Sequence, residues 1–301
     1  MRYFLYVYLL FFNINFLSAQ EIQSKSRIDE IVVTAEFNDI DAFNISSSIS
    51  IISENDISKR NANHLEDLLF ITPNVNYSSG ASRGKFYQIR GIGERSEFTE
   101  PVNYSVGVII DGIDFTGIAL GASTFDVKQI EILRGPQGTL YGANALAGLI
   151  NIVSNDPTED FYSEISGSIS EFGGKDFGII ISNSNDNNFG YRLGFKNSKS
   201  DGFVKNVYLN RDDTNDIDET ISRAKFTKNN DTTKLTLNIF YADIDNGYDA
   251  FSLDNTRTTY SDEPGYDRQK TTAASTKFEK TLRNNNTIAV SYTHLRAHET
   301  R

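Results

Sequence analysis

Apolar and polar residues alternate one by one in several short runs after residue 157, and polar loops separate the runs. The alternating runs are residues 177–182, 191–195, 235–242 and 288–292. A period of two puts successive side chains on opposite faces of a strand, so each run predicts a strand with one apolar face. Apolar outward faces with interleaved aromatic residues are typical of transmembrane β-strands, but a soluble β-sandwich has the same alternation. The pattern alone leaves both architectures open.

Before residue 157 the pattern changes to short β-branched runs separated by turn residues. The predicted strands are residues 48–52, 86–90, 106–110, 127–133 and 149–153. Asp111-Gly112 follows the third of these strands and predicts a tight hairpin turn, because glycine tolerates the positive φ that such turns require.

Two short helices are predicted in the same region. Residues 53–56 have the spacing of a capped helix start, and residues 63–66 repeat it. The second helix continues through apolar residues at helical spacing and ends at Thr72, because a residue before proline is kept out of the α region. His64 then lies in the first turn of this helix, and we expect it on the surface. Strands and short helices in this order predict a small α+β domain.

The N-terminus has the pattern of an export signal. Arg2 supplies a positive charge, residues 3–12 are apolar and aromatic, and Ala19 is a small residue suited to cleavage. A membrane anchor fits less well, because a spanning helix needs about 20 apolar residues and asparagines interrupt this run. Residues 1–19 are therefore predicted to be a signal peptide, and Gln20 to be the first residue of the mature protein.

A short apolar segment stands between polar stretches a few residues after the signal. It consists of Asp29, Glu30, Ile31, Val32, Val33, Thr34 and Ala35. Its centre is β-branched and extended in character. The segment is therefore either an edge strand of the domain that follows or a strand that a partner protein adds to its own sheet.

Composition excludes several classes of function. The chain has no Cys and three His, so a thiolate metal site and a Cys nucleophile are excluded, and His64 is the only histidine outside the last few residues. A hydrolase would have to work with carboxylates alone, and no convincing pair stands out. The formal net charge of -11 opposes nucleic-acid binding, which needs a basic patch. Residues 206–220 are rich in Asp and Asn but lack the glycine of a calcium loop, so they predict a solvated loop. We expect no metal, no cofactor and no enzymatic activity.

Glycines punctuate three segments before residue 157. These are QIRGIG at 88–93, VGVIIDG at 106–112 and VKQIEILRGPQGTLYGANALAGLINIV at 127–153. The first has Ser96 where a dinucleotide fingerprint needs its third glycine, and the last lacks the Gly-Lys-Ser/Thr of a phosphate loop. In order and spacing, the three segments closely resemble the plug-domain motifs of TonB-dependent receptors. The segment at 29–35 resembles the TonB box of the same family.

The resemblance implies the fold and the domain boundaries. We expect a signal peptide at 1–19 and a periplasmic segment at 20–45 that contains the box at 29–35. The plug would follow at 46–156, barrel strands at 157–293 and a non-native tail at 294–301. The plug would be an α+β domain with a small mixed sheet and short helices, followed by antiparallel transmembrane β-barrel strands. Barrels of this kind have roughly 22 strands. The room after the plug holds about eight, so only part of a barrel is expected.

The resemblance also implies a function. Such a receptor lies in the bacterial outer membrane, in contact with its lipid, and imports a scarce extracellular ligand. A ferric siderophore or another metal chelate is the expected ligand, with cobalamin, heme and glycans as alternatives. A TonB-type energy-coupling protein would grasp the box from the periplasm, and we expect the box to lie outside the core of the plug. The rival interpretation is a binding-only surface receptor or adhesin with a permanent plug, which needs no such handle.

Two groups of plug residues follow from this interpretation. The apical connections 78–85 and 93–104 are expected to contact ligand, with Arg83, Lys85, Arg95, Glu97 and Tyr104 as the candidates. An architectural role is expected for the motif residues Arg90, Gly91, Asp111, Gly112, Arg134, Gly135, Pro136, Gly138, Tyr141, Gly142 and Gly148. Arg134 is expected either to pair with a carboxylate of the barrel wall or to lie on the surface.

Overall fold

The computed structural model describes residues 32–34, 40–41, 47–79, 81–96, 103–250, 252, 254, 256–283 and 286–300. The predicted signal peptide lies outside these residues, and of the predicted box only Val32, Val33 and Thr34 are described. Residues 33–301 form one compact unit. Within the described part of the chain, no helix combines the length and the apolar character needed to cross a membrane.

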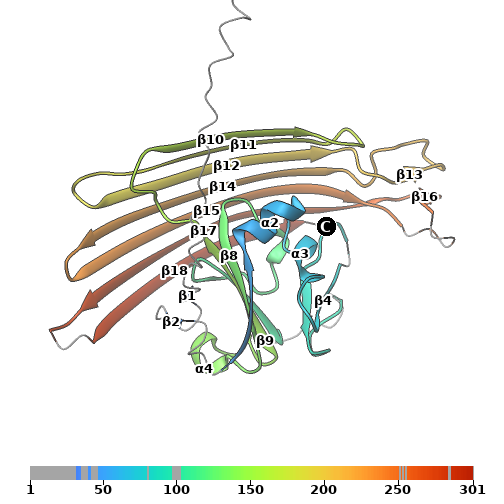
Figure 1. The fold of residues 1–301 in the computed structure, drawn as a ribbon. Coiled ribbons are helices and arrows are strands. Elements are labelled where there is room, and N and C mark those ends of the chain that lie inside the picture. The colour runs from blue at the N-terminus through green and yellow to red at the C-terminus, as the bar shows by residue number, and fades with distance from the viewer. Residues whose placement is uncertain are drawn as a thin grey trace, which may run out of the picture. The chain divides into compact units, whose positions relative to one another are not determined.

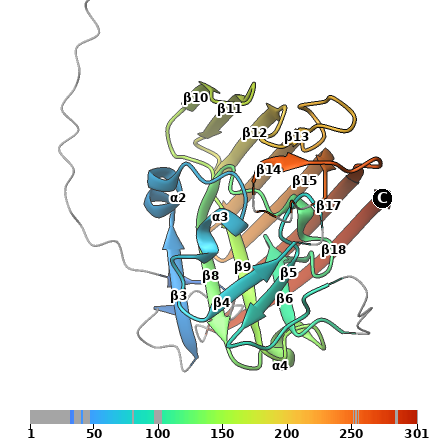
Figure 2. The same cartoon turned by 90° about the vertical axis from the view of Figure 1, so that its right-hand side faces the viewer.

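A five-stranded mixed sheet forms the centre of the plug region, residues 47–156 (Figures 1 and 2). Its strands, in spatial order, are β3 (Ser48–Ser53), β8 (Val127–Arg134), β9 (Gly148–Ser154), β6 (Val106–Ile110) and β7 (Ile113–Asp114). β6 and β9 pair in parallel, and the other neighbours pair antiparallel. Asp111 and Gly112 join β6 to β7 with φ values of 48° and 80°, as the predicted tight turn requires.

Smaller elements surround this sheet. A hairpin joins β4 (Val75–Ser78) to β5 (Phe86–Ile89), and β1 (Val32–Val33) pairs with β2 (Ile40–Asp41). The first predicted helix is α2 (Glu54–Arg60), whose Ser53 side chain accepts from the Asp56 N–H as a capping box requires. The second is shorter than predicted, α3 (Glu66–Leu69), and no side chain of its N-cap residue caps it. Further helical turns among the described residues are α4 (Gly138–Tyr141) and the 3-10 turn η3 (Ala119–Gly121).

His64 was predicted to lie on the surface, and this prediction is wrong. The residue is buried, with an exposed fraction of 1%. Its Nε2 lies 3.3 Å from the carbonyl oxygen of Ala119, and its Nδ1 accepts from the Glu66 N–H at 3.4 Å. These contacts assign the neutral tautomer with the proton on Nε2. Burial lowers the pKa of His64 below its usual 6.5. The correction follows from the helix start, because α3 begins after His64 and leaves it free to turn inward toward η3.

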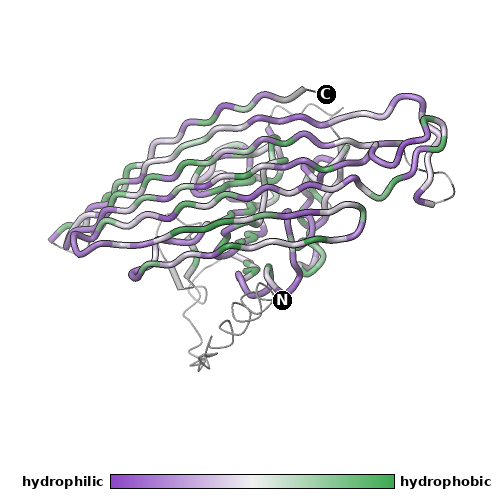
Figure 3. Tube along the Cα trace, turned by 90° about the horizontal axis from the view of Figure 1, so that it is seen from above, coloured by the Kyte–Doolittle hydropathy of each residue, from purple (hydrophilic) through white to green (hydrophobic). Residues whose placement is uncertain are grey.

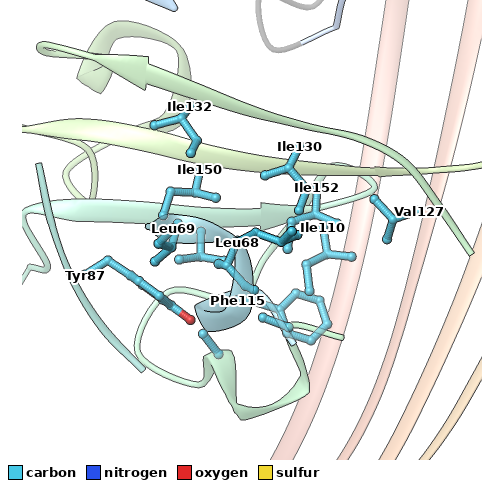
Figure 4. Close-up of a cluster of buried hydrophobic side chains, with 14 of the residues drawn as sticks. Leu68, Leu69, Tyr87, Ile110, Phe115, Val127, Ile130, Ile132, Ile150 and Ile152 are labelled. Carbon is cyan, nitrogen blue, oxygen red and sulfur yellow. The ribbon is translucent and has the colours of Figure 1, made fainter. Parts of the chain in front are cut away.

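Aliphatic side chains from the sheet and from α3 form one core (Figure 4). Ile132 on β8, Ile150 on β9 and Leu68 on α3 are all fully buried there. Phe115, which follows β7, is also fully buried and packs edge-on against Phe240 of the second sheet, with ring centroids 5.2 Å apart. The plug core is therefore continuous with apolar side chains of that sheet.

The second sheet, called the wall here, is antiparallel and has seven strands that curve over the plug region (Figures 1 and 2). Its strands are β10 (Tyr162–Ile169), β11 (Lys175–Ser184), β12 (Phe189–Ser200), β14 (Ile217–Asn230), β15 (Thr233–Tyr248), β17 (Gly265–Thr281) and β18 (Thr287–Thr300). All four alternating runs of the sequence lie on these strands. The count of wall strands is one fewer than the estimate of about eight.

Alternation along the wall strands separates two faces, as predicted (Figure 3). On β15, Leu235 and Ile239 are about two-fifths exposed, while Phe240 and Ala242 are buried against the plug region. On β14 most of the inward residues are polar, and Arg223 and Lys225 are both buried, whereas the buried Ile221 is apolar. An apolar outer face with a partly polar inner face is the arrangement of a transmembrane β-strand.

Short turns connect the wall strands at one end, and two long connections lie at the other end. The long connections, residues 201–216 and 249–264, pair with each other through β13 (Lys205–Asn206) and β16 (Thr258–Thr259). Asn206 is fully buried, and its side-chain nitrogen donates to Asp249 and to the Ser261 carbonyl oxygen, both at 2.9 Å. The predicted solvated loop at 206–220 is thus wrong at both ends, because its first residue is buried and β14 begins at Ile217.

The last described residues, up to Thr300, continue β18 and pair with β17. The sequence pattern predicts the strand only as far as Tyr292, where the alternation stops. That residues 294–301 are not native sequence stays a prediction, since it concerns the origin of the tail rather than its conformation.

Candidate functional site

The plug region meets the inner face of the wall through charged side chains, and this contact is called the seam here. Among the described residues, the seam contains three groups of ion pairs. They are centred on Arg83, Asp111 and Asp126 of the plug region. Each reaches a wall strand far away in the sequence, so the groups fix how the plug region sits against the wall.

The first group lies near the long connections. The Arg83 guanidinium donates to Glu219 of β14 at 2.8 Å and to Glu66 of α3 at 3.1 Å. Burial alone would lower the pKa of Arg83, but the two carboxylates raise it above its usual value. Ser82 adds two hydrogen bonds to Asp267 of β17, from its N–H at 2.8 Å and from its hydroxyl at 2.9 Å. The tip of the β4–β5 hairpin is therefore fastened to two wall strands.

The second group is built on the hairpin turn after β6. The Asp111 carboxylate lies 3.6 Å from the Arg223 guanidinium and 3.8 Å from the Lys225 ammonium, both on β14. The N–H and hydroxyl of Ser154 also donate to Asp111, each at 2.9 Å. The Asp111 carbonyl oxygen accepts from the Ser275 hydroxyl on β17 at 3.0 Å. The Asp-Gly motif thus does more than turn the chain, because it also contacts the wall.

The third group lies close to the short turns. Arg192 of β12 binds the Asp126 carboxylate through its Nε at 2.9 Å and through a second guanidinium nitrogen at 2.7 Å. Asp126 has a φ of 55°, a conformation that Asp and Asn adopt more readily than other residues with a side chain. This bidentate pair is the strongest single contact of the seam by geometry.

The candidate ligand residues do not form one apical site. Arg83 is fastened in the seam, and Lys85 is buried with its ammonium 5.6 Å from the ring centroid of Phe86. Arg95 is exposed, Tyr104 is half-buried, and Glu97 lies outside the described residues. Two carboxylates hold the Arg83 guanidinium in this structure, and its contact with a ligand stays a prediction.

Among the described residues, Arg134 pairs with no carboxylate of the wall, which was one of the two roles predicted for it. Its guanidinium donates to the Ser50 hydroxyl at 2.8 Å and to the Pro73 carbonyl oxygen at 3.1 Å, and the side chain is half-buried. Within the described residues, the wall carboxylate is bound by Arg83 instead. Nothing in the local sequence distinguishes the two arginines. Only the three-dimensional position of Glu219 does so.

The architectural role of the glycine-rich motif residues stays a prediction, and several of them have backbone conformations that favour glycine. Gly148 has a φ of 159°, and a side chain there would come within 2.4 Å of the Leu133 carbonyl oxygen. Positive φ values are also found at Arg90, Gly91, Gly135 and Gly142. Tyr141 is partly buried and packs against a second small core cluster. Pro136 lies in the turn between β8 and α4, and Gly138 is the first residue of α4.

Part of the predicted box is inside the plug region, contrary to expectation. Val33 is fully buried in the second core cluster with Ile109, Leu133, Ala145 and Leu149. The N–H of Thr34 donates to the buried Glu131 carboxylate at 2.9 Å. The expectation that the box lies outside the core of the plug is therefore wrong at these two residues. The sequence did not predict this contact, because the strands that cover Val33 and Thr34 lie about a hundred residues later in the chain.

No group of His, Asp or Glu side chains among the described residues has the arrangement needed to hold a metal ion. The buried ion pairs of the seam position the plug region against the wall.

Comparison with known proteins finds relatives of part of the chain. A family model described as the TonB-dependent receptor plug domain matches residues 41–149. The chain is 28% identical over 155 residues to the vitamin B12 transporter BtuB of Vibrio vulnificus (strain CMCP6), which covers 51% of this chain and 24% of the relative. It is 32% identical over 130 residues to the pesticin receptor of Yersinia pestis, covering 43% and 19%.

The fold is also similar to a solved structure. The crystal structure of the ferric yersiniabactin uptake receptor FyuA from Yersinia pestis matches with a TM-score of 0.70 and 20% identity, over 84% of this chain and 41% of that chain. The chain thus spans about a quarter or less of the two curated relatives. The resemblance drawn from the sequence motifs is confirmed, and so is the fold class of a plug domain followed by antiparallel strands like part of a receptor barrel.

Proposed function

We propose that this chain, whose residues 41–149 are a TonB-dependent receptor plug domain, is part of an outer-membrane receptor that imports a scarce ligand with energy supplied by a TonB-type partner. The observation that carries the proposal is the seam. Its three groups of ion pairs hold the plug against the wall with charged contacts.

A polar seam favours a plug that moves over a permanent stopper. The desolvation penalty of a buried ion pair roughly cancels the attraction between its charges, so such pairs add little net stability. When water enters the seam, the separated charges are hydrated again. The core cluster of the described plug residues consists of apolar side chains, so we expect force applied to the plug to open the charged seam before it disrupts the core. Apolar contacts such as that of Phe115 with Phe240 also join the plug to the wall, so opening the seam would separate these contacts as well.

The orientation follows from the lengths of the connections. Barrels of the outer membrane have short periplasmic turns and longer extracellular loops. The long connections at 201–216 and 249–264 would then be extracellular, and the Arg83 group would lie on their side of the plug. The Asp126 group would lie near the periplasm. The outward apolar residues of the wall would contact lipid.

A ferric siderophore or another metal chelate is the ligand that we propose. FyuA, which resembles this chain in fold, is a ferric yersiniabactin uptake receptor, and BtuB, a sequence relative, is a vitamin B12 transporter. Cobalamin is therefore the second ligand to test. A panel of radioactive-iron siderophores and labelled cobalamin, given to cells that express the full-length receptor, separates the two.

The decisive experiment is Val32→Pro in the full-length receptor. Proline has no N–H and fixes φ near -65°, so it removes a hydrogen bond from any strand added at the box and distorts its neighbours. Each lost bond is worth about 1 kcal/mol, and 1.4 kcal/mol is about tenfold, so loss of the bond at Val32 together with one neighbouring bond should lower uptake by more than about tenfold. Surface binding of the same labelled ligand should be unchanged.

Val32→Ile is the matched control, because it keeps the N–H and the β-branched shape, and it should import nearly as well as the wild type. Both variants are compared with and without a protonophore. Full uptake by the proline variant would remove the box from the mechanism. Binding without any uptake by the wild type would favour the receptor with a permanent plug.

A further inference from the structure

The Glu131 carboxylate on β8 is fully buried and gathers hydrogen-bond donors from three other residues. One oxygen accepts from the Thr34 N–H at 2.9 Å, the Thr34 hydroxyl at 3.1 Å and the Gln129 side chain at 2.6 Å. The other oxygen accepts from the Asn151 side chain at 2.9 Å. Asn151 also donates to the Thr34 hydroxyl at 3.2 Å. Thr34 is thus bound by two side chains of the central sheet.

An apolar anchor lies directly beside this polar one. Val33 is fully buried in the cluster that contains Leu133 of β8 and Leu149 of β9. Two consecutive residues are therefore held by the same pair of strands, one by exclusion of water and the other by a charged acceptor. Hydrogen bonds to a charged group are about twice as strong as neutral ones.

Release of Thr34 from the Glu131 carboxylate should cost little free energy. If Thr34 leaves, the carboxylate loses two of its donors but keeps Gln129 and Asn151, and water can reach the space that Thr34 occupied. A buried charge without any donor would be far more costly. The arrangement is therefore suited to a reversible contact.

We propose that Glu131, supported by Asn151, is a dock that holds the chain at Thr34 and so sets how often the adjoining partner-binding segment is free. The part about the partner rests on the function proposed above. Glu131 is a positioning residue in this role, since it acts through Thr34. An occupied dock keeps the handle on the plug in the resting receptor.

The test is amide hydrogen exchange of the full-length receptor in detergent, with the peptide that contains Thr34 as the readout. Glu131→Gln replaces one carboxylate oxygen by a donor, so the side chain can no longer accept from both Thr34 and Asn151. Loss of one charged hydrogen bond is worth about tenfold, so the Thr34 amide should exchange about tenfold faster or more. The amides of β8 and β9 should keep their rates.

Glu94→Gln is the matched control. Glu94 accepts from the N–H of Ser105 at 3.0 Å and from its hydroxyl at 2.9 Å, the same pair of donors that Thr34 offers to Glu131. This variant should leave exchange at Thr34 unchanged. Thr34→Val keeps the N–H but removes the hydroxyl, and it should raise the exchange rate by a smaller factor than Glu131→Gln.

Unchanged exchange at Thr34 in Glu131→Gln would overturn the dock. So would equally faster exchange across β8 and β9, because Glu131 would then support the plug fold and not the segment. Uptake by the wild type is measured beside this. If the wild type imports nothing while Thr34 still responds to Glu131→Gln, the proposed function fails and the dock stands.

Discussion

The plug core and the seam are both buried, yet different interactions hold them together. The core is aliphatic, with Ile132, Ile150 and Leu68 fully excluded from water. The seam is made of ion pairs and hydrogen bonds from side chain to backbone, such as the one from Arg223 to the Ser123 carbonyl oxygen at 2.9 Å. The core depends on shape, whereas the seam adds matched charges to apolar contacts such as that of Phe115 with Phe240.

The difference predicts how each region responds to change. A close-packed core loses stability whenever volume is removed, because neighbours relax only partially. A charged seam loses stability when one partner is removed but tolerates the removal of both, because a single charge left in a buried place is the costly state. The same rule lets the seam open as a whole, with water replacing every partner at once.

The largest effect is expected for Asp126→Asn. Asparagine keeps the positive φ of this position but leaves the Arg192 guanidinium buried without its anion. We expect a loss of about 3–5 kcal/mol in the free energy of unfolding. Urea unfolding of the full-length receptor measures it.

The paired variant Asp126→Asn with Arg192→Met decides the matter, because it removes both charges and keeps the length of the side chain. It should recover most of the lost stability. If the double variant is as unstable as the single one, the seam depends on packing in the same way as the core.

A core substitution comes next in size. Leu68→Ala should cost about 2–5 kcal/mol, because the side chain is fully buried and its removal leaves a cavity. Leu68→Met nearly conserves volume and should cost less than about 1.5 kcal/mol. The same urea unfolding experiment compares them. A loss below that of the methionine control would show that the core is looser than its burial indicates.

The smallest effect is the acid sensitivity of His64, which lies where core and seam meet. Burial lowers its pKa, and Glu66, Asp67, Arg83 and Glu219 are the charged groups around it. The unfolded chain takes up a proton near pH 6.5, but the buried imidazole does so only at lower pH, so stability should fall as the pH drops below about 6.5.

Each unit by which the pKa is lowered is worth about 1.4 kcal/mol of this effect. The stability of the wild type at about pH 7.5 and about pH 5.5 is compared with that of His64→Gln, which cannot titrate there. An equal acid-induced loss in both proteins would assign the sensitivity to other groups.

Much of the plug fold could be predicted because its sequence signals are local. The runs that became β6, β8 and β9 are dense in β-branched residues and end at Gly or Asp-Gly turns. The cap at Ser53 was correct in detail. The wall strands β11, β12 and β15 were predicted because their outward faces are plainly apolar.

The rest depends on partners that are remote in sequence. β14 and β17 were missed because their inward residues, such as Arg223, Lys225 and Gln269, are polar and their outward residues are only weakly apolar. For the same reason the sequence could not choose Arg83 over Arg134 as the partner of a wall carboxylate. The burial of Val33 and the hydrogen bonds of Thr34 could not be predicted from the local sequence either, because the two strands that they contact lie about a hundred residues away in the chain.

The bond network of Asn206 makes the two long connections thermodynamically inseparable. Its side chain bonds to Asp249 and Ser261, and its strand pairs with Thr258–Thr259, so neither connection can leave its place without freeing the other. Ordering a free loop costs about 1–2 kcal/mol of backbone entropy for each residue. Here that entropy is lost once, during folding. A molecule that binds only one connection would therefore act against the combined stiffness of both. Any loosening that it causes in that connection would also loosen the connection that it does not touch.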